Sequence, residues 1–520
     1  MIRDSVRTHD EMVAAATEAH GLVPTALRAI EQLLHAMHRR SYSPEFIRLV
    51  HGFWAEHLCH DVVHRRRAKS TSSPDKTPDF LIPTGKPRYP SDTTSTLTRA
   101  DLIDLMLNRP SAAIDVALRS QTVPDIRTPL TYRVRNAATS TIAHRVAPVW
   151  VSHPYLPTSP SEKVRRAIRT RRVVRWWDFE HQQGESCDPS PVRLAVVRSS
   201  EGESIDALIR RLVAMTLPLD LGENLTTIES SVHSRFSRIP RLMYTANAQH
   251  YMTGFKVAAA IAKQEGSRLL IHQHGGGYGI DEWHAGEVYD RSVADTFYTF
   301  GWNDDAPGCR ATPLPVPPRS IERRSTGTAY LLMSVEYTTE FFRFQSFCLP
   351  THAESCVSET VEFTRGLSAA TRLTFRSAPA LPFPVERIAP CDCTIEIAEA
   401  EARGVDLAAE ARLVIHNYLG TSWLETLAMN VPTVCFYDPA IYRPREAARP
   451  FFEQLTRVGV IHYSGREAAK FVNGFNGDPS AWWNSAEVQE AREAFVARYA
   501  NFSDNWLDAW LEEFDRLLSE

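Results

Sequence analysis

The sequence has few lysines and no long apolar run. Only seven lysines stand among its 520 residues, although arginine is plentiful, and the formal net charge is −4 with a pI near 6.6. A nucleic-acid-binding protein needs basic residues concentrated on one face, so this composition argues against nucleic acid as a partner. No apolar run approaches the ~20 residues of a membrane span, and the first residues lack the apolar core of a signal peptide. We therefore expect a cytoplasmic protein without a transmembrane segment.

Cysteine patterns of the structural kind are also missing. The eight cysteines are scattered, no CxxC pair occurs, and only Cys391 and Cys393 lie close together in the sequence. This distribution is typical of reduced thiols in a cytoplasm. It argues against a disulfide framework or a zinc site.

The length and the patterning predict two domains, because 520 residues are too many for one hydrophobic core. Residues 1–68 have helical periodicity, and residues 70–98 are rich in Ser, Thr and Pro, as in a surface connection. Short apolar runs then alternate with helical patterns, which predicts an α/β fold with largely parallel sheets. Prolines cluster within residues 312–318. We place the boundary there, giving an N-terminal domain of residues 1–310, a linker of residues 311–325 and a C-terminal domain of residues 326–520.

Residues 411–438 have the pattern of a strand, a tight turn, a helix and a second strand. Gly420 ends the first strand, and Thr421 or Ser422 supplies a hydroxyl for a helix N-cap, with Glu425 placed as in a capping box. Such a turn presents N–H groups at the positive end of a helix dipole, where phosphate binds well. The capping box alone also accounts for Ser422 and Glu425, so both interpretations stay open.

A second motif follows a predicted strand at residues 268–273. Consecutive glycines allow φ > 0 and a close approach of the backbone to a ligand. His274 lies at the carboxyl end of the strand, where open α/β sheets bind ligands, although a structural histidine beside a flexible loop is an equal alternative. After His274 come three glycines and two acidic residues, namely Gly275, Gly276, Gly277, Asp281 and Glu282.

Two hydrolase interpretations of this motif are not favoured. His-Gly-Gly-Gly also occurs in the oxyanion loop of α/β-hydrolases, which require a Gly-x-Ser-x-Gly elbow further along the chain. The sequence has no such elbow, because the segment from Gly420 to Leu424 lacks the second glycine. His272, His274 and His284 could begin a metal-hydrolase site, but no further ligand pattern accompanies them.

Together the two motifs resemble a known family. The likeness is carried by His-Gln-His-Gly-Gly-Gly-Tyr-Gly at residues 272–279 and by Asn-Tyr-Leu-Gly-Thr-Ser-Trp-Leu-Glu-Thr-Leu-Ala-Met-Asn-Val-Pro-Thr at residues 417–433, and it extends over residues 30–515. The family is a bacterial one of transferases found among surface-carbohydrate genes of the O-antigen and capsule type, and it is similar to the GT-B glycosyltransferases. The resemblance implies a GT-B-like α/β fold, in which two Rossmann-type domains with parallel sheets face each other across a cleft, with a helical N-terminal region. It also implies a further segment before the first domain, so the extent of the first sheet stays open.

The resemblance further implies a metal-independent Leloir glycosyltransferase of lipopolysaccharide or capsule biosynthesis that needs no cofactor. Its partners would be a nucleotide-sugar donor and a glycan or lipid-linked acceptor. A turn rich in Ser and Thr, with a histidine nearby, suits a single phosphate, so our hypothesis for the donor is a CMP-sugar such as CMP-Kdo or a CMP-nonulosonate. Peripheral contact with the inner face of the membrane through the N-terminal helices stays open.

The resemblance assigns roles on the donor side. The donor phosphate would lie at the helix N-terminus after Gly420, and Glu425 would reach a ribose or sugar hydroxyl unless it serves the capping box. His416 and Arg376 would neutralise the charge of the leaving phosphate. No Asp-x-Asp pair is present for a metal ion. The expected donor-binding residues are Arg376, His416, Gly420, Thr421, Ser422 and Glu425.

On the acceptor side, an inverting enzyme needs a base from the opposite domain, and we expect it to be His274, Asp281 or Glu282. A retaining enzyme could work without one, so the stereochemical outcome stays open. Two other functions fit the same motifs. One is a nucleotide-sugar 2-epimerase of GT-B architecture, and the other is a non-catalytic nucleotide- or carbohydrate-binding subunit of a polysaccharide assembly complex.

Overall fold

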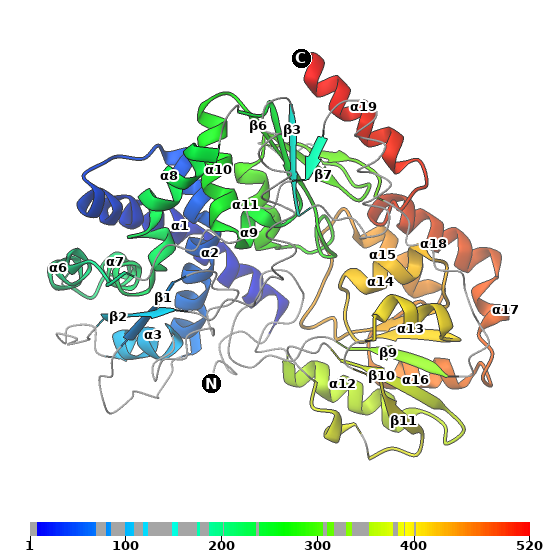
Figure 1. Cartoon of the computed structure of the whole chain (residues 1–520). Coiled ribbons are helices and arrows are strands. Elements are labelled where there is room, and N and C mark those ends of the chain that lie inside the picture. Colours follow the sequence, from blue (N-terminus) through cyan, green and yellow to red (C-terminus); the bar gives the residue numbers. More distant parts are fainter. Residues whose placement is uncertain are drawn as a thin grey trace.

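The computed structural model describes residues 8–68, 80–84, 99–108, 118–122, 148–153, 174–176, 187–200, 202–235, 239–304, 309–316, 329–334, 353–377, 383–388, 390–399 and 402–520. These residues form two six-stranded parallel sheets, a two-stranded parallel sheet and the helices around them (Figure 1). No helix among these residues combines the length and the hydropathy needed to cross a membrane.

Two long helices, α1 (His9–His38) and α2 (Pro44–Ala68), pack along each other and account for the helical pattern near the start of the sequence. A capping box begins α1, because Thr8 and Glu11 each accept a hydrogen bond from the other's backbone N–H. The smaller elements of this region are β1 (Phe80–Thr84), α3 (Arg99–Asn108), β2 (Leu118–Thr122), α6 (Pro191–Ser199), α7 (Ile205–Thr216), η1 (Leu219–Leu221) and α8 (Leu225–Arg235). Strand β1 falls inside the predicted connection at residues 70–98, of which the rest lies outside the described residues.

The N-terminal sheet is covered on both faces. Alternate side chains of a strand point to opposite faces, so Trp150 and Met243 join the core formed with α10, whereas Val151 and Tyr244 pack with aromatic residues of the last helix. In spatial order its strands are β4 (Val174–Trp176), β3 (Val149–Ser152), β5 (Leu242–Thr245), β6 (Arg268–His272), β7 (Thr296–Thr299) and β8 (Ala311–Pro313). Its helices are α9 (Ala248–Tyr251), α10 (Thr253–Gln264) and α11 (Ala285–Val293).

The C-terminal sheet has the strand order of a Rossmann fold. In spatial order its strands are β11 (Thr394–Ile397), β10 (Arg372–Arg376), β9 (Tyr330–Met333), β12 (Leu413–His416), β13 (Thr433–Phe436) and β14 (Ile461–His462). The chain builds outward from β9 to β11 and then crosses to β12, so the topological switch point lies between β9 and β12. The remaining elements are α12 (Ala353–Gly366), η2 (Val385–Arg387), α13 (Gly404–Glu410), α14 (Thr421–Ala428), α15 (Arg449–Arg457), α16 (Gly465–Asn473), α17 (Ser480–Trp483), α18 (Ala486–Tyr499) and α19 (Trp506–Ser519).

The predicted α/β architecture of two Rossmann-type domains with parallel sheets is therefore confirmed, but two details of the domain division differ. Strand β8 pairs with β7, so the first residues of the predicted linker belong to the N-terminal sheet. Pro313 is tolerated there because β8 is an edge strand. Residues 317–328 lie outside the described part of the chain.

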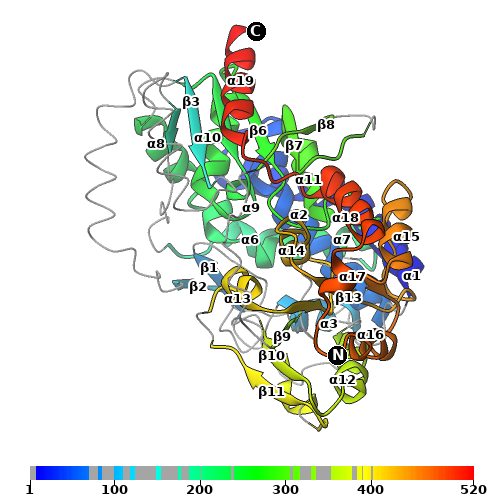
Figure 2. The same cartoon turned by 90° about the vertical axis from the view of Figure 1, so that its right-hand side faces the viewer.

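The second difference concerns α19, which belongs by sequence to the C-terminal half but packs on the N-terminal sheet (Figure 2). The Trp510 ring meets Tyr244 edge-to-face at 4.6 Å, and its indole N–H donates to the carbonyl of Pro315 at 3.0 Å. Periodicity correctly predicts that this aromatic stripe is buried, but it does not identify the surface that buries it.

Candidate functional site

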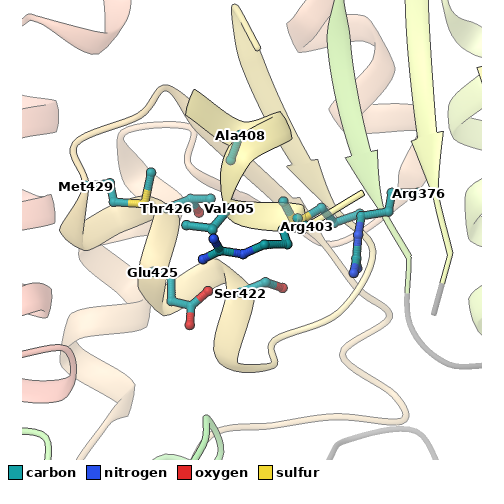
Figure 3. Close-up of a pocket in the computed structure, with 10 residues that line it drawn as sticks. Arg376, Arg403, Val405, Ala408, Ser422, Glu425, Thr426 and Met429 are labelled. Carbon is teal, nitrogen blue, oxygen red and sulfur yellow. The ribbon is translucent and has the colours of Figure 1, made fainter. Parts of the chain in front are cut away.

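A pocket of about 280 Å³ opens at the carboxyl edge of the C-terminal sheet, beside its switch point. Ligands of open α/β sheets bind in this position because the strand order reverses there and leaves a crevice. Met333 and Arg376 end β9 and β10, and α13 and α14 form the two walls (Figure 3). The lining residues are Met333, Arg376, Arg403, Gly404, Val405, Ala408, Ser422, Glu425, Thr426 and Met429.

The pocket combines two guanidinium groups with one buried carboxyl group. The side chain of Arg376 packs over Gly404, where a Cβ would lie 3.3 Å from the guanidinium, and its Nε donates to the carbonyl of Ala402 at 3.3 Å. Arg403 is exposed at the rim, while Glu425 is 9% exposed on α14. Arginines bind phosphate or carboxylate groups through charge-assisted hydrogen bonds, and a carboxylate accepts from hydroxyls. The pocket therefore suits a ligand with both an anionic group and hydroxyl groups.

The start of α14 differs from the predicted capping box. The N-cap is Gly420, no side chain caps the helix, and Ser422 lies inside the first turn with its hydroxyl 2.9 Å from that of Tyr418. Because Ser422 has helical geometry, it cannot cap the helix that contains it. The capping-box interpretation is thus wrong, and Ser422 and Glu425 face the pocket instead.

His416 is not brought to the pocket. It is fully buried at the end of β12, and its Nε2 lies 3.1 Å from the hydroxyl of Thr426, which itself donates to the carbonyl of Trp423. Burial lowers the pKa of His416 to about 3. The expectation that His416 neutralises a leaving phosphate is corrected, because desolvation keeps the imidazole neutral.

The side chain of Gln273, directly after β6, links the glycine loop to the turn after β7. The side-chain oxygen of Gln273 accepts from the backbone N–H of Phe300 at 2.9 Å and from the indole N–H of Trp302 at 2.8 Å. Its side-chain NH₂ donates to the backbone carbonyl of Gly275 at 2.9 Å. Gly277 has φ +92° and a Cβ there would clash with the Asp281 carboxylate. Glycine is therefore needed at this position for both backbone conformation and space.

The two motifs predicted from the sequence touch each other across the domain boundary. The backbone N–H of Gly276 donates to the hydroxyl of Thr421 at 2.9 Å. A Cβ on Gly276 would lie 2.6 Å from the carbonyl carbon of Gly420. The absence of a side chain at Gly276 thus lets the glycine loop meet the N-terminus of α14. Thr421 serves this contact and is not among the pocket-lining residues.

The three candidate bases have different surroundings. Asp281 is 7% exposed and accepts from the hydroxyl of Tyr442 in the other domain at 2.8 Å, and burial raises its pKa to about 7. Glu282 lies 2.8 Å from Nε2 of His9 at the start of α1. His274 is half-buried at the root of the glycine loop, with its Nδ1 3.3 Å from the hydroxyl of Tyr278.

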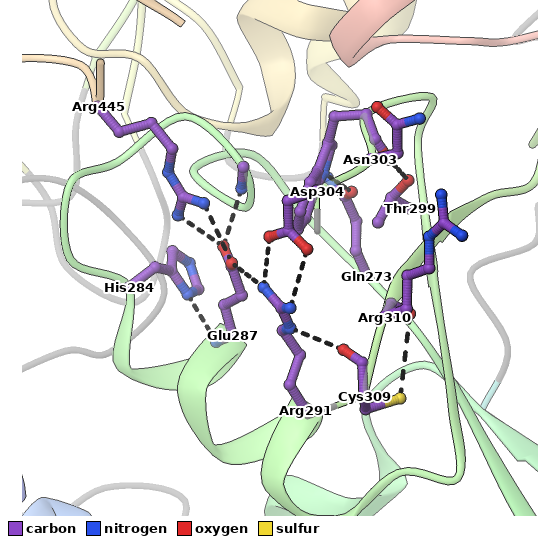
Figure 4. A network of polar contacts seen from close by, with 12 residues as sticks. Gln273, His284, Glu287, Arg291, Thr299, Asn303, Asp304, Cys309, Arg310 and Arg445 are labelled. Atoms are coloured by element: carbon purple, nitrogen blue, oxygen red, sulfur yellow. Dashed lines mark hydrogen bonds and ion pairs between the residues drawn. The ribbon is translucent and has the colours of Figure 1, made fainter. Parts of the chain in front are cut away.

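A buried polar network beneath the loop was not predicted from the sequence. Glu287 on α11 accepts from the backbone N–H of Gly279 at 2.8 Å and pairs with Arg445 of the C-terminal domain at 2.8 Å (Figure 4). Arg291 also contacts Glu287 at 3.3 Å and binds Asp304 through two nitrogens at 2.7 and 2.9 Å. No spacing or motif links Glu287 to Arg445, because they meet only through folding. Arg403 was also missed, since no local pattern distinguishes it from the other exposed arginines.

Comparison with known proteins places the chain in a family. Residues 112–514, more than half of the chain, match the family described as LIC12162 family transferase. No curated protein matches the chain. Among the part of the chain that the structure describes, no group of three or more His, Cys, Asp or Glu side chains is arranged to hold a metal ion.

Three solved structures share a weak similarity with the chain. MurG of Acinetobacter baumannii has 10% identity and a TM-score of 0.36, over 71% of this chain and 99% of that one. A mutant O-GlcNAc transferase of Thermobaculum terrenum has 14% identity and a TM-score of 0.35, over 97% and 83%. The spinosyn rhamnosyltransferase SpnG, in complex with spinosyn aglycone, has 9% identity and a TM-score of 0.32, over 72% and 100%.

Proposed function

The chain belongs to the LIC12162 family of transferases, and from this premise we propose that it transfers a glycosyl group from a nucleotide-sugar to an acceptor hydroxyl. One observation carries the proposal. Helix α14 lines the pocket at the switch point of the C-terminal sheet, and its first residue also contacts the glycine loop. This loop follows His274 in the other domain. A donor in the pocket would thus lie beside a loop that can present an acceptor and a base.

On the donor side, we assign the phosphate to the guanidinium of Arg376 and the N-terminal turn of α14. Both supply positive potential at the leaving phosphate, which gains negative charge as its bond to the sugar breaks. Glu425 would accept from ribose or sugar hydroxyls, and Arg403 at the rim would bind a second anionic group of the donor. Because these arginines and the helix N-terminus can neutralise the anionic groups of the donor, we propose a transfer that requires no metal ion.

On the acceptor side, we assign the base to His274. Asp281 is committed to Tyr442, and Glu282 to His9, in contacts that hold the domains and α1 together. In the transfer, the acceptor oxygen gives its proton to His274 and forms a bond to the anomeric carbon. The bond from that carbon to the phosphate oxygen breaks, and its electron pair leaves with the phosphate.

The finer identity of the substrates rests on the resemblance of the two motifs to surface-carbohydrate transferases. We propose a CMP-sugar as the donor and a surface-polysaccharide or lipid-linked glycan as the acceptor. Peripheral contact with the inner face of the membrane belongs to the same proposal.

The test is thermal unfolding of the purified chain with CMP, UDP, GDP and dTDP, each with EDTA or Mg²⁺. A ligand that binds only the folded state at a hundredfold excess over its dissociation constant adds about 2.7 kcal/mol to the unfolding free energy. We expect CMP to stabilise the protein equally with EDTA and with Mg²⁺. Arg376→Ala and Glu425→Gln should each weaken binding about tenfold or more, because each removes a charge-assisted contact. Glu453→Gln on the exposed side of α15 is the matched control.

Preference for UDP or GDP would contradict the CMP-sugar proposal and leave glycosyl transfer standing. Stabilisation only with Mg²⁺ would contradict the metal-independent transfer. No stabilisation by any nucleotide would contradict a nucleotide-sugar donor. Turnover of the donor to a free epimerised sugar without acceptor would instead identify an epimerase.

A further inference from the structure

We propose that Tyr278 and Asp290 are positioning residues that hold the imidazole of His274 with its proton on Nδ1, so that Nε2 faces the reaction as the base. The inference rests on the proposed function for its kinetic consequences. Its structural content, the tautomer of His274, can be tested without any activity.

Asp290 anchors the arrangement. It is completely buried on α11, and its Oδ1 lies 2.7 Å from Nε2 of His250 and accepts from the amide of Gln249 at 2.8 Å. Its Oδ2 accepts from the hydroxyl of Tyr278 at 2.9 Å. A carboxylate has only acceptor sites, so each of these neighbours directs a proton towards Asp290.

The hydroxyl proton of Tyr278 is therefore engaged by Asp290 and is not available to His274. A phenol carries one O–H, and in Tyr278 this group donates to Asp290. Burial first, and then the charge of Asp290, raise the pKa of Tyr278 well above its ordinary value, so the phenol keeps its proton. The same oxygen lies 3.3 Å from Nδ1 of His274. Since the oxygen can only accept in this contact, Nδ1 must carry the proton, and the neutral ring is unprotonated at Nε2.

Rings on either side restrict the rotation of His274. Its ring meets that of His250 edge-to-face with centroids 4.9 Å apart, and that of Tyr278 at 5.6 Å. His250 is itself stacked on Phe53 of α2 at 4.3 Å. The orientation of His274 is thus set by residues from α9, α11 and the glycine loop together. This is the kind of support that a base needs for a defined approach to its proton.

Several titratable groups face this site and shape its pH dependence. His272 on β6 and His284 before α11 both have lowered pKa values, first through burial and also through the charge of His274. From the other domain, Arg445 lowers the pKa of His284 as well. Asp290, which is also paired with Nε2 of His250, supplies a negative charge that acts on His274 through Tyr278. Asp281 and Glu287 lie near the loop. Removing the charge of Asp290 should therefore make protonation of His274 harder.

The experiment compares the wild type with Tyr278→Phe, Asp290→Asn and His274→Gln. The matched control is Tyr289→Phe, which removes another buried hydroxyl of the same region, bonded to the backbone carbonyls of Leu49 at 2.8 Å and Gln249 at 3.4 Å. We expect Tyr278→Phe to lower kcat by about tenfold to a hundredfold, with the donor KM unchanged within about twofold. Asp290→Asn should shift the acid limb of kcat/KM to lower pH by about half a unit to one unit, because the imidazolium loses a stabilising negative charge.

The tautomer is read independently from imidazole ¹⁵N chemical shifts, with the His274 signal assigned by its loss in His274→Gln. Protonation on Nδ1 in the wild type, changed in Tyr278→Phe and unchanged in Tyr289→Phe, supports the proposal even if no sugar transfer is found. Protonation on Nε2 overturns it. If His274→Gln abolishes transfer while Tyr278→Phe behaves as Tyr289→Phe in kcat and pH profile, the positioning role is overturned and the proposed function stands. Tyr278→Phe keeps the test decisive if Asp290→Asn does not fold.

Discussion

Asp281 shows how a single ionisable residue can link pH to the contact between the domains. Its carboxyl group lies against Gly277 and accepts from the hydroxyl of Tyr442, while its backbone carbonyl accepts from Nε of Arg445. Burial raises its pKa to about 7, although the hydrogen bond from Tyr442 and the charge of Arg445 oppose this shift. The sequence made Asp281 a candidate catalytic base. An acidic residue after a glycine loop has the same sequence pattern whether its side chain faces solvent or a buried tyrosine.

We predict that this carboxyl makes stability fall as pH rises between about 4 and 7. Below this window both folded and unfolded states hold the proton, and above it both have lost it. Within it the folded state binds more protons, so unfolding free energy decreases with pH, by up to about 1.4 kcal/mol per unit. Urea unfolding at several pH values should show a smaller decrease across this window in Asp281→Asn than in the wild type.

The control for that prediction is Asp508→Asn, which changes an exposed carboxyl on α19. Its curve should run parallel to that of the wild type. Parallel curves for the wild type and Asp281→Asn would show that Asp281 does not take up a proton on folding.

At the scale of elements, α14 is positioned by its buried face. Trp423 is fully buried and meets Phe495 of α18 at 4.8 Å and Phe452 of α15 at 5.8 Å between ring centroids. Arg492 of α18 donates to the carbonyl of Leu427 at 3.1 Å, near the helix C-terminus. The pocket face of the helix, with Ser422 and Glu425, is thus held from behind.

We predict that Trp423→Ala lowers the unfolding free energy by about 3–5 kcal/mol, the range for removing a buried large aromatic side chain. Chemical denaturation measures the change. Ile397→Ala on edge strand β11, where the side chain is 58% exposed, is the control and should change stability by less than about 0.5 kcal/mol. A similar small effect for Trp423→Ala would mean that α14 is held by other contacts.

At the scale of the whole molecule, contacts at the carboxyl edges of the sheets join the two domains, in addition to the packing of α19. They include the bond from Gly276 to Thr421, the pair of Glu287 with Arg445, and the bond from Tyr442 to Asp281. The first of these leaves no room for a side chain on Gly276, whose neighbours across the boundary are backbone atoms. Backbone cannot rotate away as a flexible side chain can.

We therefore predict that Gly276→Ala separates the two edges and lowers the proposed transfer rate by about a hundredfold, the effect expected from displacing reacting groups by about 1 Å. Small-angle scattering should show a larger radius of gyration. Gly21→Ala is the control, because Gly21 lies on α1 with no atom within 4 Å of a Cβ. Unchanged scattering and kinetics in Gly276→Ala would show that the domain contact accommodates a methyl group.

The sequence by itself determined the features that depend on near neighbours in the chain. Apolar runs and helical spacing specify the strands and helices, and the glycines after His274 and before Thr421 specify two tight turns at strand ends. Parallel sheets place such ends at one edge, so Arg376, Ser422 and Glu425 could be grouped, and the glycine loop set opposite them, before the fold was known. Arg376, Ser422 and Glu425 do line one pocket, and Gly276 does meet Thr421.

Only the tertiary structure decided which of these residues are accessible and what each one contacts. Several features depend on residues distant in sequence. They are the burial of His416 and Asp281, the absence of a side-chain cap on α14, the packing of α19 on the first sheet and the pair of Glu287 with Arg445. Desolvation and long-range packing leave no periodic signal in the chain, because they act through whatever element folding brings alongside. For the same reason, the link from His274 through Tyr278 to Asp290 could be recognised only once α11 was in place.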